Sequence, residues 1–309
     1  MKKVFKKIIL CFVALLVLIV LGAGGYVGYI LLSYKRIGDT SLDIESKANK
    51  EVLKINETYN MATYNIGFGA YSQDFTFFLD TGYDKEGNET CGYYSKARSK
   101  DEVYFNVNGA KETIKSLDLD FALLQEVDIK STRSYKINQN DIFKEELKDY
   151  DNVFSINFDT AYLPYPLYDM HGKSLAGLST FSRYKINEAN RYEYTISDSL
   201  SKLFDIDRCF SVSSLSVENN KTLYIINSHM SAYDKGGVIR QTQIQELNDL
   251  RVAYQGKKGV ITELGAGIKD VPNEEKKEYG MQVNVLKTPF NEKYEEVKNK
   301  LEQELINKK

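Results

Sequence analysis

The sequence predicts an α/β protein whose body follows a single N-terminal helix long enough to cross a membrane. In the body, an amphipathic segment over residues 110–117 leads through a brief turn into the apolar run Phe121 to Leu124, which stops at Glu126. A helix, a turn, a buried strand and a carboxylate at the strand's end are the order in which an open α/β sheet presents a ligand to its cleft. The second observation is the apolar run 8–32 that precedes the body.

The N-terminal segment predicts a retained membrane anchor. Lysines at positions 2, 3, 6 and 7 precede the uncharged run 8–32, and a spanning helix needs roughly 20 residues. The run is too long for the apolar part of a cleavable signal, and no small-residue cleavage site follows it. The basic excess of residues 1–7 over Lys35 and Arg36 favours a cytoplasmic N-terminus. We expect a single-pass protein of the cell membrane, with the lipid bilayer as the partner of residues 8–32 and an extracytoplasmic body; a cleaved signal would export the same body.

Composition limits the class of partner. The 309 residues carry a net charge of −2, so a polyanion could be held only by a local basic cluster. The 23 Tyr and 15 Phe with no Trp suit a β-rich body. Three cysteines are too few for a disulfide framework. With Cys11 in the apolar run, Cys91 and Cys209 form either one disulfide or two free thiols, and free thiols are the preferred alternative.

The first third of the body predicts strands separated by one long loop. Polar residues 33–50 are interpreted as a stalk, followed by an edge strand over 52–55 and a strand over 61–67 that breaks at its glycine. The aromatic segment 68–78 and the polar stretch 80–101 form a loop of a length that often lines a binding site. The aromatic loop alone would also be compatible with a wall protein that binds peptides or glycans.

The middle of the chain predicts alternating strands and helices. A polar loop carrying Arg133 leads to a helix over 139–147 and a strand over 153–158. Residues 162–173 hold two of the four prolines and are irregular, so His171 is expected at the surface or at most on a pocket rim. Further elements are strands over 178–181, 210–217 and 223–226, with a turn at Asn219-Asn220 between the last two, and a helix over 238–250.

The character of the sequence changes near residue 255, where Gly, Lys and Glu become frequent. Gly265-Ala266-Gly267 lacks the third glycine of a dinucleotide-binding motif. Thr288-Pro289 predicts the start of a terminal helix that runs to about residue 306. Its apolar stripe is interpreted as a face packed on the body, with partner binding as the alternative.

Three predicted strand ends carry polar side chains, namely Asn65, Glu126 and His229. Asn65 and Glu126 offer oxygen ligands of the kind that Mg²⁺ or Ca²⁺ accepts. His229 could act as a general acid or base near neutral pH. Arg133 and Arg240 could bind phosphate oxygens through their planar guanidinium groups. Each residue also has a separate structural explanation. Asn65 could cap a turn, Arg133 and Arg240 could be surface charges, and His229 could be a hydrogen-bonded core histidine. The coincidence of polar side chains at three strand ends nevertheless favours one site.

Four segments together resemble the endonuclease/exonuclease/phosphatase family, the superfamily of deoxyribonuclease I and sphingomyelinase, and in particular its bacterial membrane-anchored members. They read TYNIGFGAYSQDFTFF at residues 63–78, DFALLQEVDIKSTRSYKINQ at 120–139, HGKSLAGLSTFSRYKI at 171–186 and NSHMSAYDKGG at 227–237. The resemblance implies a four-layer α/β sandwich, built of two packed mixed sheets flanked by helices, over residues 51–250.

The resemblance also implies roles. Asn65 matches the first-strand asparagine that positions metal and phosphate, and Glu126 matches the metal-binding glutamate of the Gln-Glu motif. His229 matches the Asn-x-His histidine beside the scissile phosphate, while Asn227, Arg133 and Arg240 are assigned to phosphate binding. The implied chemistry is in-line hydrolysis of a phosphate ester assisted by Mg²⁺ or another divalent cation such as Ca²⁺ or Mn²⁺. Nucleic acid, a phospholipid headgroup and a small ester remain open as substrates, as does the oligomeric state.

The chain departs from the family after about residue 250. It has no Gly-Asp-aromatic-Asn motif, which supplies the aspartate that orients the attacking water, and no histidine follows His229. We therefore predict a divergent tail over 251–309, an incomplete second half of the fold and impaired catalysis, because each such group contributes about 10²–10⁴-fold to the rate. The alternative is a non-catalytic surface protein that retains a phosphate-binding cleft.

Overall fold

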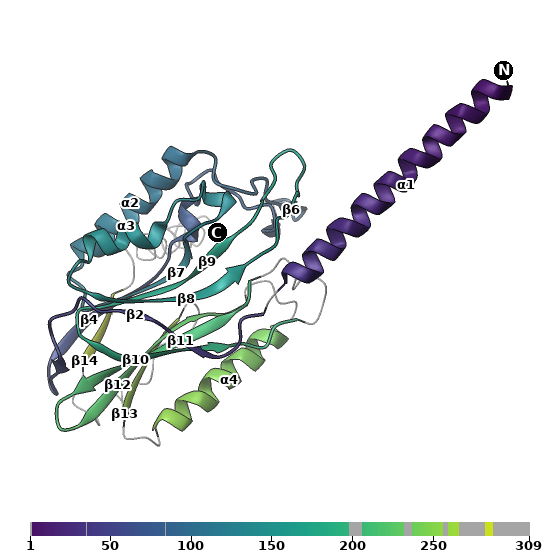
Figure 1. The fold of residues 1–309 in the computed structure, drawn as a ribbon. Helices are drawn as coiled ribbons and strands as arrows, with labels where there is room; N and C mark the ends of the chain where they lie inside the picture. Colours follow the sequence, from purple (N-terminus) through teal and green to yellow (C-terminus); the bar gives the residue numbers. More distant parts are fainter. Residues whose placement is uncertain are drawn as a thin grey trace.

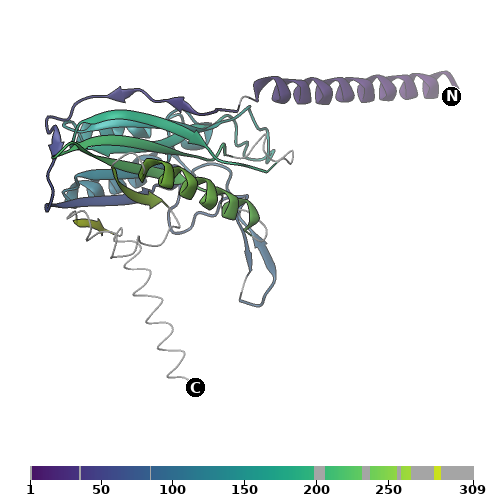
Figure 2. The same ribbon diagram turned by 90° about the horizontal axis from the view of Figure 1, so that it is seen from below.

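The computed structural model describes residues 2–34, 36–83, 85–197, 206–231, 237–255, 259–265 and 282–286. Two six-stranded mixed sheets pack face to face, and helices cover both outer faces (Figures 1 and 2). The body is therefore a four-layer α/β sandwich, as the resemblance implies.

The first sheet carries two of the candidate strand ends. Its strand order is β14 (Gln282–Leu286), β4 (Thr58–Asn65), β7 (Phe121–Asp128), β9 (Leu175–Ser182), β8 (Asp151–Asp159) and β2 (Ile44–Glu45). β14, β4 and β7 run parallel, and the remaining pairs are antiparallel. The short helices η1 (Gly67–Gly69) and η2 (Thr132–Ser134) follow β4 and β7. The carboxyl ends of β4 and β7 thus meet at one edge, as parallel pairing requires.

The outer face of this sheet is covered by α2 (Lys100–Ser116) and α3 (Gln139–Glu146). α2 begins ten residues before the predicted segment 110–117, at an N-cap where the Ser99 hydroxyl accepts a hydrogen bond from the Glu102 amide at 3.0 Å. The prediction missed the first turns of α2 because they are mostly polar. Only Val103 and Val107 in these turns belong to the buried apolar stripe of the helix. The hairpin of β5 (Thr81–Tyr83) and β6 (Glu89–Cys91) lies within the predicted long loop.

The second sheet carries the third strand end. Its order is β1 (Thr40–Ser41), β10 (Ile186–Glu193), β11 (Cys209–Val217), β12 (Lys221–His229) and β13 (Gly259–Gly265), with β3 (Val52–Leu53) parallel to the end of β11. β10 was not predicted, because its sequence INEANRYE is largely polar. Helix α4 (Val238–Gln255) packs on the outer face through Leu247, Leu250 and Tyr254.

A layer of apolar side chains between the sheets holds them together. It includes Phe121 and Leu123 from the first sheet and Leu215, Leu223 and Ile225 from the second, all 1% exposed or less. Burying such a side chain contributes about 1.5–3 kcal/mol. Because alternate residues of β7 point inward, the same strand delivers its polar end to the edge of this apolar layer.

Helix α1 (Lys2–Ser33) extends away from the body (Figures 1 and 2) and is long and apolar enough to cross a membrane. The expected stalk over 33–50 contains β1 and β2, which pair with β10 and β8. The buried Arg191 also donates hydrogen bonds from Nη1 to the carbonyls of Ile37 and Gly38. The chain therefore contacts the body within a few residues of the end of α1.

Residues after 250 contribute an edge strand to each sheet. β13 pairs in parallel with β12, and β14 pairs in parallel with β4. The predicted terminal helix over 288–306 lies outside the described residues. Cys11, Cys91 and Cys209 are all free thiols, with Cys209 buried.

Candidate functional site

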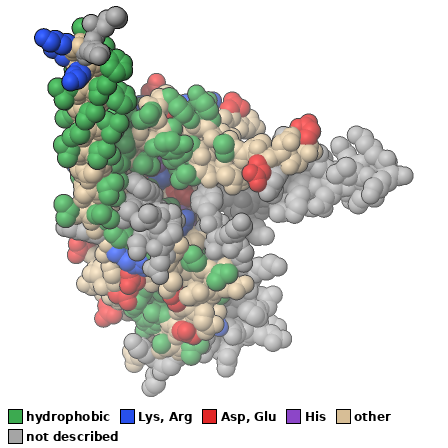
Figure 3. Space-filling view, turned by 90° about the vertical axis from the view of Figure 1, so that its right-hand side faces the viewer, with side chains coloured by type: hydrophobic (Ala, Val, Ile, Leu, Met, Phe, Trp, Pro, Cys, Tyr) green, Lys and Arg blue, Asp and Glu red, His purple; other side chains and the backbone are tan. Residues whose placement is uncertain are grey.

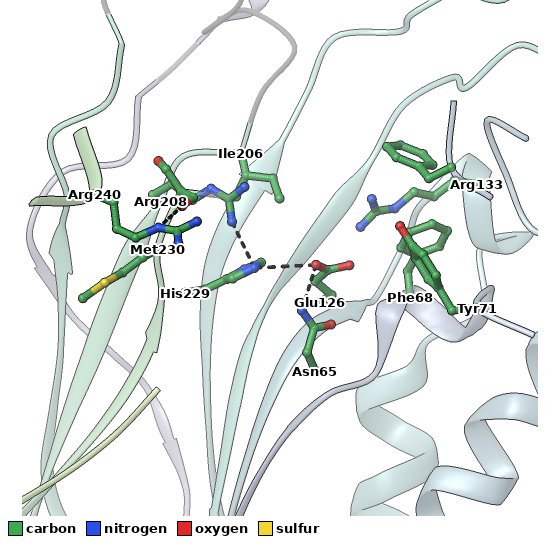
Figure 4. A pocket seen from close by; sticks show the side chains of 12 residues that line it. Asn65, Phe68, Tyr71, Glu126, Arg133, Ile206, Arg208, His229, Met230 and Arg240 are labelled. Carbon is green, nitrogen blue, oxygen red and sulfur yellow. Dashed lines mark hydrogen bonds and ion pairs between the residues drawn. The ribbon is translucent and has the colours of Figure 1, made fainter. Parts of the chain in front are cut away.

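The three polar strand ends come together in one pocket. Asn65 Nδ2 donates a hydrogen bond to Glu126 Oε1 at 2.9 Å, and the same oxygen lies 3.6 Å from His229 Nε2. Figure 4 shows the Glu126 side chain joined by dashed lines to both His229 and Asn65, which come from β12 and β4, while Glu126 comes from β7. The chemical roles assigned to them remain predictions, but their convergence is a property of the fold.

The backbone at Glu126 is bent so that its carboxylate enters the pocket. Its φ is +55°, and the pairing of β7 with β9 shifts register between Leu124 and Val127. Such a bulge re-aims side chains, and a non-glycine residue in this region stores about 1–3 kcal/mol of strain. As a result Gln125 is fully buried, where it bonds Asn227, whereas Glu126 lines the pocket.

Asn65 caps a turn and also orients Glu126. Its Oδ1 accepts a hydrogen bond from the Gly67 amide at 2.9 Å, which fixes the turn into η1. Gly67 has a φ of +53°, and a Cβ there would lie 2.5 Å from the Tyr71 ring, so glycine is required. The plain explanation of Asn65 as a turn cap is thus correct, and the same side chain still holds Glu126 through its Nδ2.

His229 is buried and neutral. Its Nε2 accepts a hydrogen bond from Arg208 Nη1 at 3.0 Å, and its Nδ1 lies 3.3 Å from Asn157 Nδ2. Burial, together with the charges of Arg208 and Arg133, holds the pKa of His229 well below its usual 6.5. At neutral pH the imidazole is therefore an acceptor or a base, and does not have the proton that a general acid needs.

Three arginines line the pocket, which has a cavity volume of about 210 Å³ and aromatic walls from Phe68, Tyr71 and Phe77. Arg133 is only 4% exposed and forms a two-point pair with Asp128, Nη2 to Oδ1 at 2.8 Å and Nε to Oδ2 at 3.1 Å. Asp128 therefore compensates much of the charge of Arg133. Arg240 is exposed and donates from Nε to the Ser231 carbonyl at 2.8 Å.

Asn227 does not line the pocket, so the structure contradicts its predicted contact with phosphate. Its side chain is fully buried between the sheets, where Nδ2 bonds the Ser179 carbonyl at 3.1 Å and Thr180 Oγ1 at 3.2 Å. Its Oδ1 accepts a hydrogen bond from Gln125 Nε2 at 2.8 Å. Asn227 precedes His229 by two residues and therefore lies on the same, inward face of β12. Its amide connects β12 to the first sheet.

The expectation that His171 lies at the surface is also wrong. It is 5% exposed, beneath the rings of Phe77 and Phe78, with Nδ1 2.7 Å from the Ser95 carbonyl and Nε2 3.2 Å from Ser174 Oγ. Burial, with the nearby charge of Arg133, lowers the pKa of His171 to about 4. A Pro-containing loop predicted exposure, but the aromatic segment folds over it.

Sequence reasoning missed two partners of His229. One partner, Arg208, could have been found, because the predicted turn at Asn219-Asn220 joins β11 and β12 into a hairpin in which Cys209 lies opposite His229. Arg208 precedes Cys209, so this register places it beside the histidine. No local signal marks Asn157, which reaches His229 from β8 in the other sheet.

The donor set fits a divalent cation held mainly by Glu126. Its Oε1 accepts a hydrogen bond from Asn65 and lies 3.6 Å from His229 Nε2, whereas Oε2 accepts no hydrogen bond from any residue that the structure describes. Within that part of the chain, no three His, Cys, Asp or Glu side chains gather as a metal cage. Mg²⁺ commonly binds through one or two carboxylates, water and substrate phosphate, so a single glutamate at this pocket is compatible with it.

The end of the chain matches a different kind of protein. Residues 242–309 match the family described as the aminoacyl tRNA synthetase class II, N-terminal domain. The chain is 44% identical over 78 residues to a phenylalanine–tRNA ligase alpha subunit of Macrococcus caseolyticus, covering 25% of this chain and 21% of that protein. It is 46% identical over 69 residues to the Aquifex aeolicus subunit, covering 21% and 20%. The chain thus spans about a fifth of the length of these relatives.

Several solved structures that align with 62–73% of this chain are of another family. An endonuclease/exonuclease/phosphatase from Beutenbergia cavernae aligns with a TM-score of 0.41 and 13% identity, covering 62% of this chain and 43% of that one. ANGEL2, a 2′,3′-cyclic phosphatase, aligns with a TM-score of 0.42 and 16% identity, covering 73% of this chain and 55% of that one. The human Nocturnin catalytic domain aligns with a TM-score of 0.40 and 16% identity, covering 72% of this chain and 67% of that one. These neighbours are endonuclease/exonuclease/phosphatase-family proteins.

Proposed function

We propose that this chain is a membrane-anchored, outward-facing protein of endonuclease/exonuclease/phosphatase type that binds a divalent cation and a phosphate ester but hydrolyses it poorly. The observation that carries the proposal is the convergence of Asn65, Glu126 and His229, contributed by three separate strands, in a pocket lined by arginines. An amide, a carboxylate and an imidazole beside guanidinium groups form a donor set suited to a metal and a phosphate.

In this proposal each residue has a limited task. Glu126 holds the cation through its carboxylate, and Asn65 fixes the orientation of that carboxylate through a 2.9 Å hydrogen bond. The cation, when bound, neutralises negative charge that develops on phosphoryl oxygens. Arg208 and Arg240 supply positive charge at the pocket, whereas the charge of Arg133 is largely compensated by Asp128. His229, held neutral, contacts Glu126 and accepts from Arg208.

Impairment follows from what replaces the missing motif. The segment in which the family carries its Gly-Asp-aromatic-Asn aspartate is here the segment that resembles a tRNA ligase subunit. We infer that the chain joins two unrelated sequences close to α4, which begins at Val238, just before the matched residues. Ligase activity is not proposed, because only about a fifth of those relatives is represented.

The test is a comparison of metal binding with catalysis. Full-length protein in detergent is titrated with Mn²⁺ by calorimetry and assayed with bis-p-nitrophenyl phosphate in Mg²⁺ or Mn²⁺. We expect Mn²⁺ binding that Glu126→Gln weakens at least tenfold, and a rate that exceeds that of Glu126→Gln only slightly. A matched control is Glu102→Gln, since Glu102 lies in the first turn of α2, pairs with Arg98 and is outside the pocket lining.

Two results would change the assignment. Absence of Mn²⁺ binding that depends on Glu126 would contradict the proposed site. Metal-dependent binding of inorganic phosphate with no turnover above the Glu126→Gln variant would favour the alternative, a non-catalytic surface protein with a phosphate-binding cleft. Resequencing the gene from the codon for Val238 to just past the codon for Leu250 would decide whether the junction is native.

A further inference from the structure

The last turns of α1 are hydrogen-bonded to the body at the level where a membrane surface would lie. Tyr26 Oη donates to the Tyr162 carbonyl at 2.8 Å, and Tyr29 Oη accepts from the Tyr162 amide at 3.1 Å. At 1.5 Å per residue, the helix from Lys7 to Tyr26 is about 28 Å long, close to the roughly 30 Å of a hydrocarbon core. If Lys7 marks one boundary of the core, Tyr26 marks the other.

Beside this contact lies an exposed apolar region, which we call the aromatic surface. Its members are Tyr93 (59% exposed), Tyr162 (41%), Tyr165 (59%), Leu167 (78%), Tyr168 (64%) and Met170 (38%). Five of the six lie between β8 and β9, and the ring of Tyr93 stacks on Tyr168 with centroids 5.3 Å apart. Figure 3 shows hydrophobic side chains gathered next to α1 on the face from which that helix emerges.

The aromatic surface is continuous with the wall of the pocket. Phe77 lines the pocket, its ring packs on Phe78 at 4.9 Å, and Phe78 packs on Tyr165 at 5.9 Å. On the same face, Figure 3 shows a hollow in which acidic and basic side chains are visible beside the hydrophobic cluster.

The other side of the pocket is tied to the chain that leaves α1. Arg191 bonds the carbonyl of Gly38 with Nη1 at 3.0 Å and the carbonyl of Asp207 with Nη2 at 3.3 Å. Arg208, the next residue, lines the pocket. The pocket is therefore connected to the aromatic surface through Phe77 and Phe78, and to the segment that follows α1 through Arg208 and the contacts of Arg191.

We propose that the aromatic surface docks on the headgroup region of the lipid bilayer and holds the mouth of the pocket against the membrane. Tyrosine is enriched at membrane–water boundaries because its ring is apolar and its hydroxyl is polar. An exposed patch of this kind on a soluble face is uncommon and marks an interaction site. The inference rests on the proposed anchoring by α1, and it restricts the pocket to phosphate groups presented at the membrane surface.

The absence of tryptophan from the sequence allows a direct test. Three single-tryptophan variants of the full chain are reconstituted in phosphatidylcholine vesicles that carry a nitroxide at carbon 5 or at carbon 12 of one acyl chain. Tyr168→Trp reports on the aromatic surface and Leu18→Trp on the middle of α1. Val252→Trp is the matched control, because it is 61% exposed and about 18 Å along α4 from the pocket residue Arg240.

We expect the carbon-5 label to quench Tyr168→Trp by at least half and more strongly than the carbon-12 label does. Leu18→Trp should be quenched best by carbon 12, and Val252→Trp by neither. Quenching of Leu18→Trp with none of Tyr168→Trp would overturn docking while leaving the anchor intact. An unquenched Leu18→Trp would overturn the anchor itself, and docking with it.

A second variant tests whether apolar contact drives the docking. Leu167→Asp, added to Tyr168→Trp, should reduce the quenching at least twofold, because a carboxylate is disfavoured below the headgroups. Leu167 is 78% exposed, so its replacement should leave the thermal midpoint unchanged. Undiminished quenching in a folded variant would refute the assignment.

Discussion

Replacing Arg133 by methionine is the perturbation that best separates a buried structural arginine from a phosphate-binding one. Arg133 is 4% exposed, its partner Asp128 is fully buried, and two hydrogen bonds of 2.8 and 3.1 Å join them. The guanidinium carbon also lies 4.0 Å from the centre of the Phe68 ring. Arg133→Met removes all of these contacts and leaves the carboxylate of Asp128 with Ser134 as its remaining side-chain partner.

The cost follows from the uncompensated carboxylate. Breaking a buried ion pair by removing one partner costs about 3–5 kcal/mol, and a domain of this kind has about 5–15 kcal/mol in total. The assay is urea unfolding of the full chain in detergent, followed by far-UV circular dichroism. The exposed Arg240→Met serves as the matched control and should change the free energy of unfolding by less than about 1 kcal/mol.

A double variant completes the thermodynamic cycle. Asp128→Asn combined with Arg133→Met should recover about 1–3 kcal/mol of the loss, because the buried charge is removed together with its partner. If Arg133→Met instead unfolds like the parent protein, the pair is not buried as described. Equal stability with weakened phosphate binding would return Arg133 to the ligand-binding role predicted from sequence.

Further predictions concern pH, the contact between the sheets and close backbone packing. Burial lowers the pKa of His171 to about 4, so the unfolded chain takes up a proton first as pH falls. Stability is complete above about pH 6.5 and declines by up to about 3 kcal/mol as pH falls to 4, and urea titrations of His171→Gln should lack this component. Asn227→Leu should cost about 2–4 kcal/mol in the same assay, because it leaves the buried amide of Gln125 short of a partner. A Cβ at Gly177 would lie 2.3 Å from the Ser155 carbonyl oxygen, so Gly177→Ala should lower the thermal midpoint through about 1–3 kcal/mol of strain; an unchanged midpoint would contradict this close approach.

The sequence was sufficient where the signal is local and periodic. The run from Phe121 to Glu126 predicts a buried strand with a carboxylate at its end, and β7 covers it. The same reasoning predicts the hairpin at Asn219-Asn220, where both residues have the positive φ that such a turn requires. It fails at β10, because a strand with few apolar residues carries too weak an alternation to be recognised.

The sequence by itself determined which side chains end the strands and that no Gly-Asp-aromatic-Asn motif follows them. Only the tertiary structure decided how those side chains are used. It buries Arg133 against Asp128, turns Asn227 between the sheets and brings Arg208 and Asn157 to His229. The physical reason is that periodicity fixes the face on which a residue lies, whereas its partner across the sheets depends on packing between segments far apart in the chain.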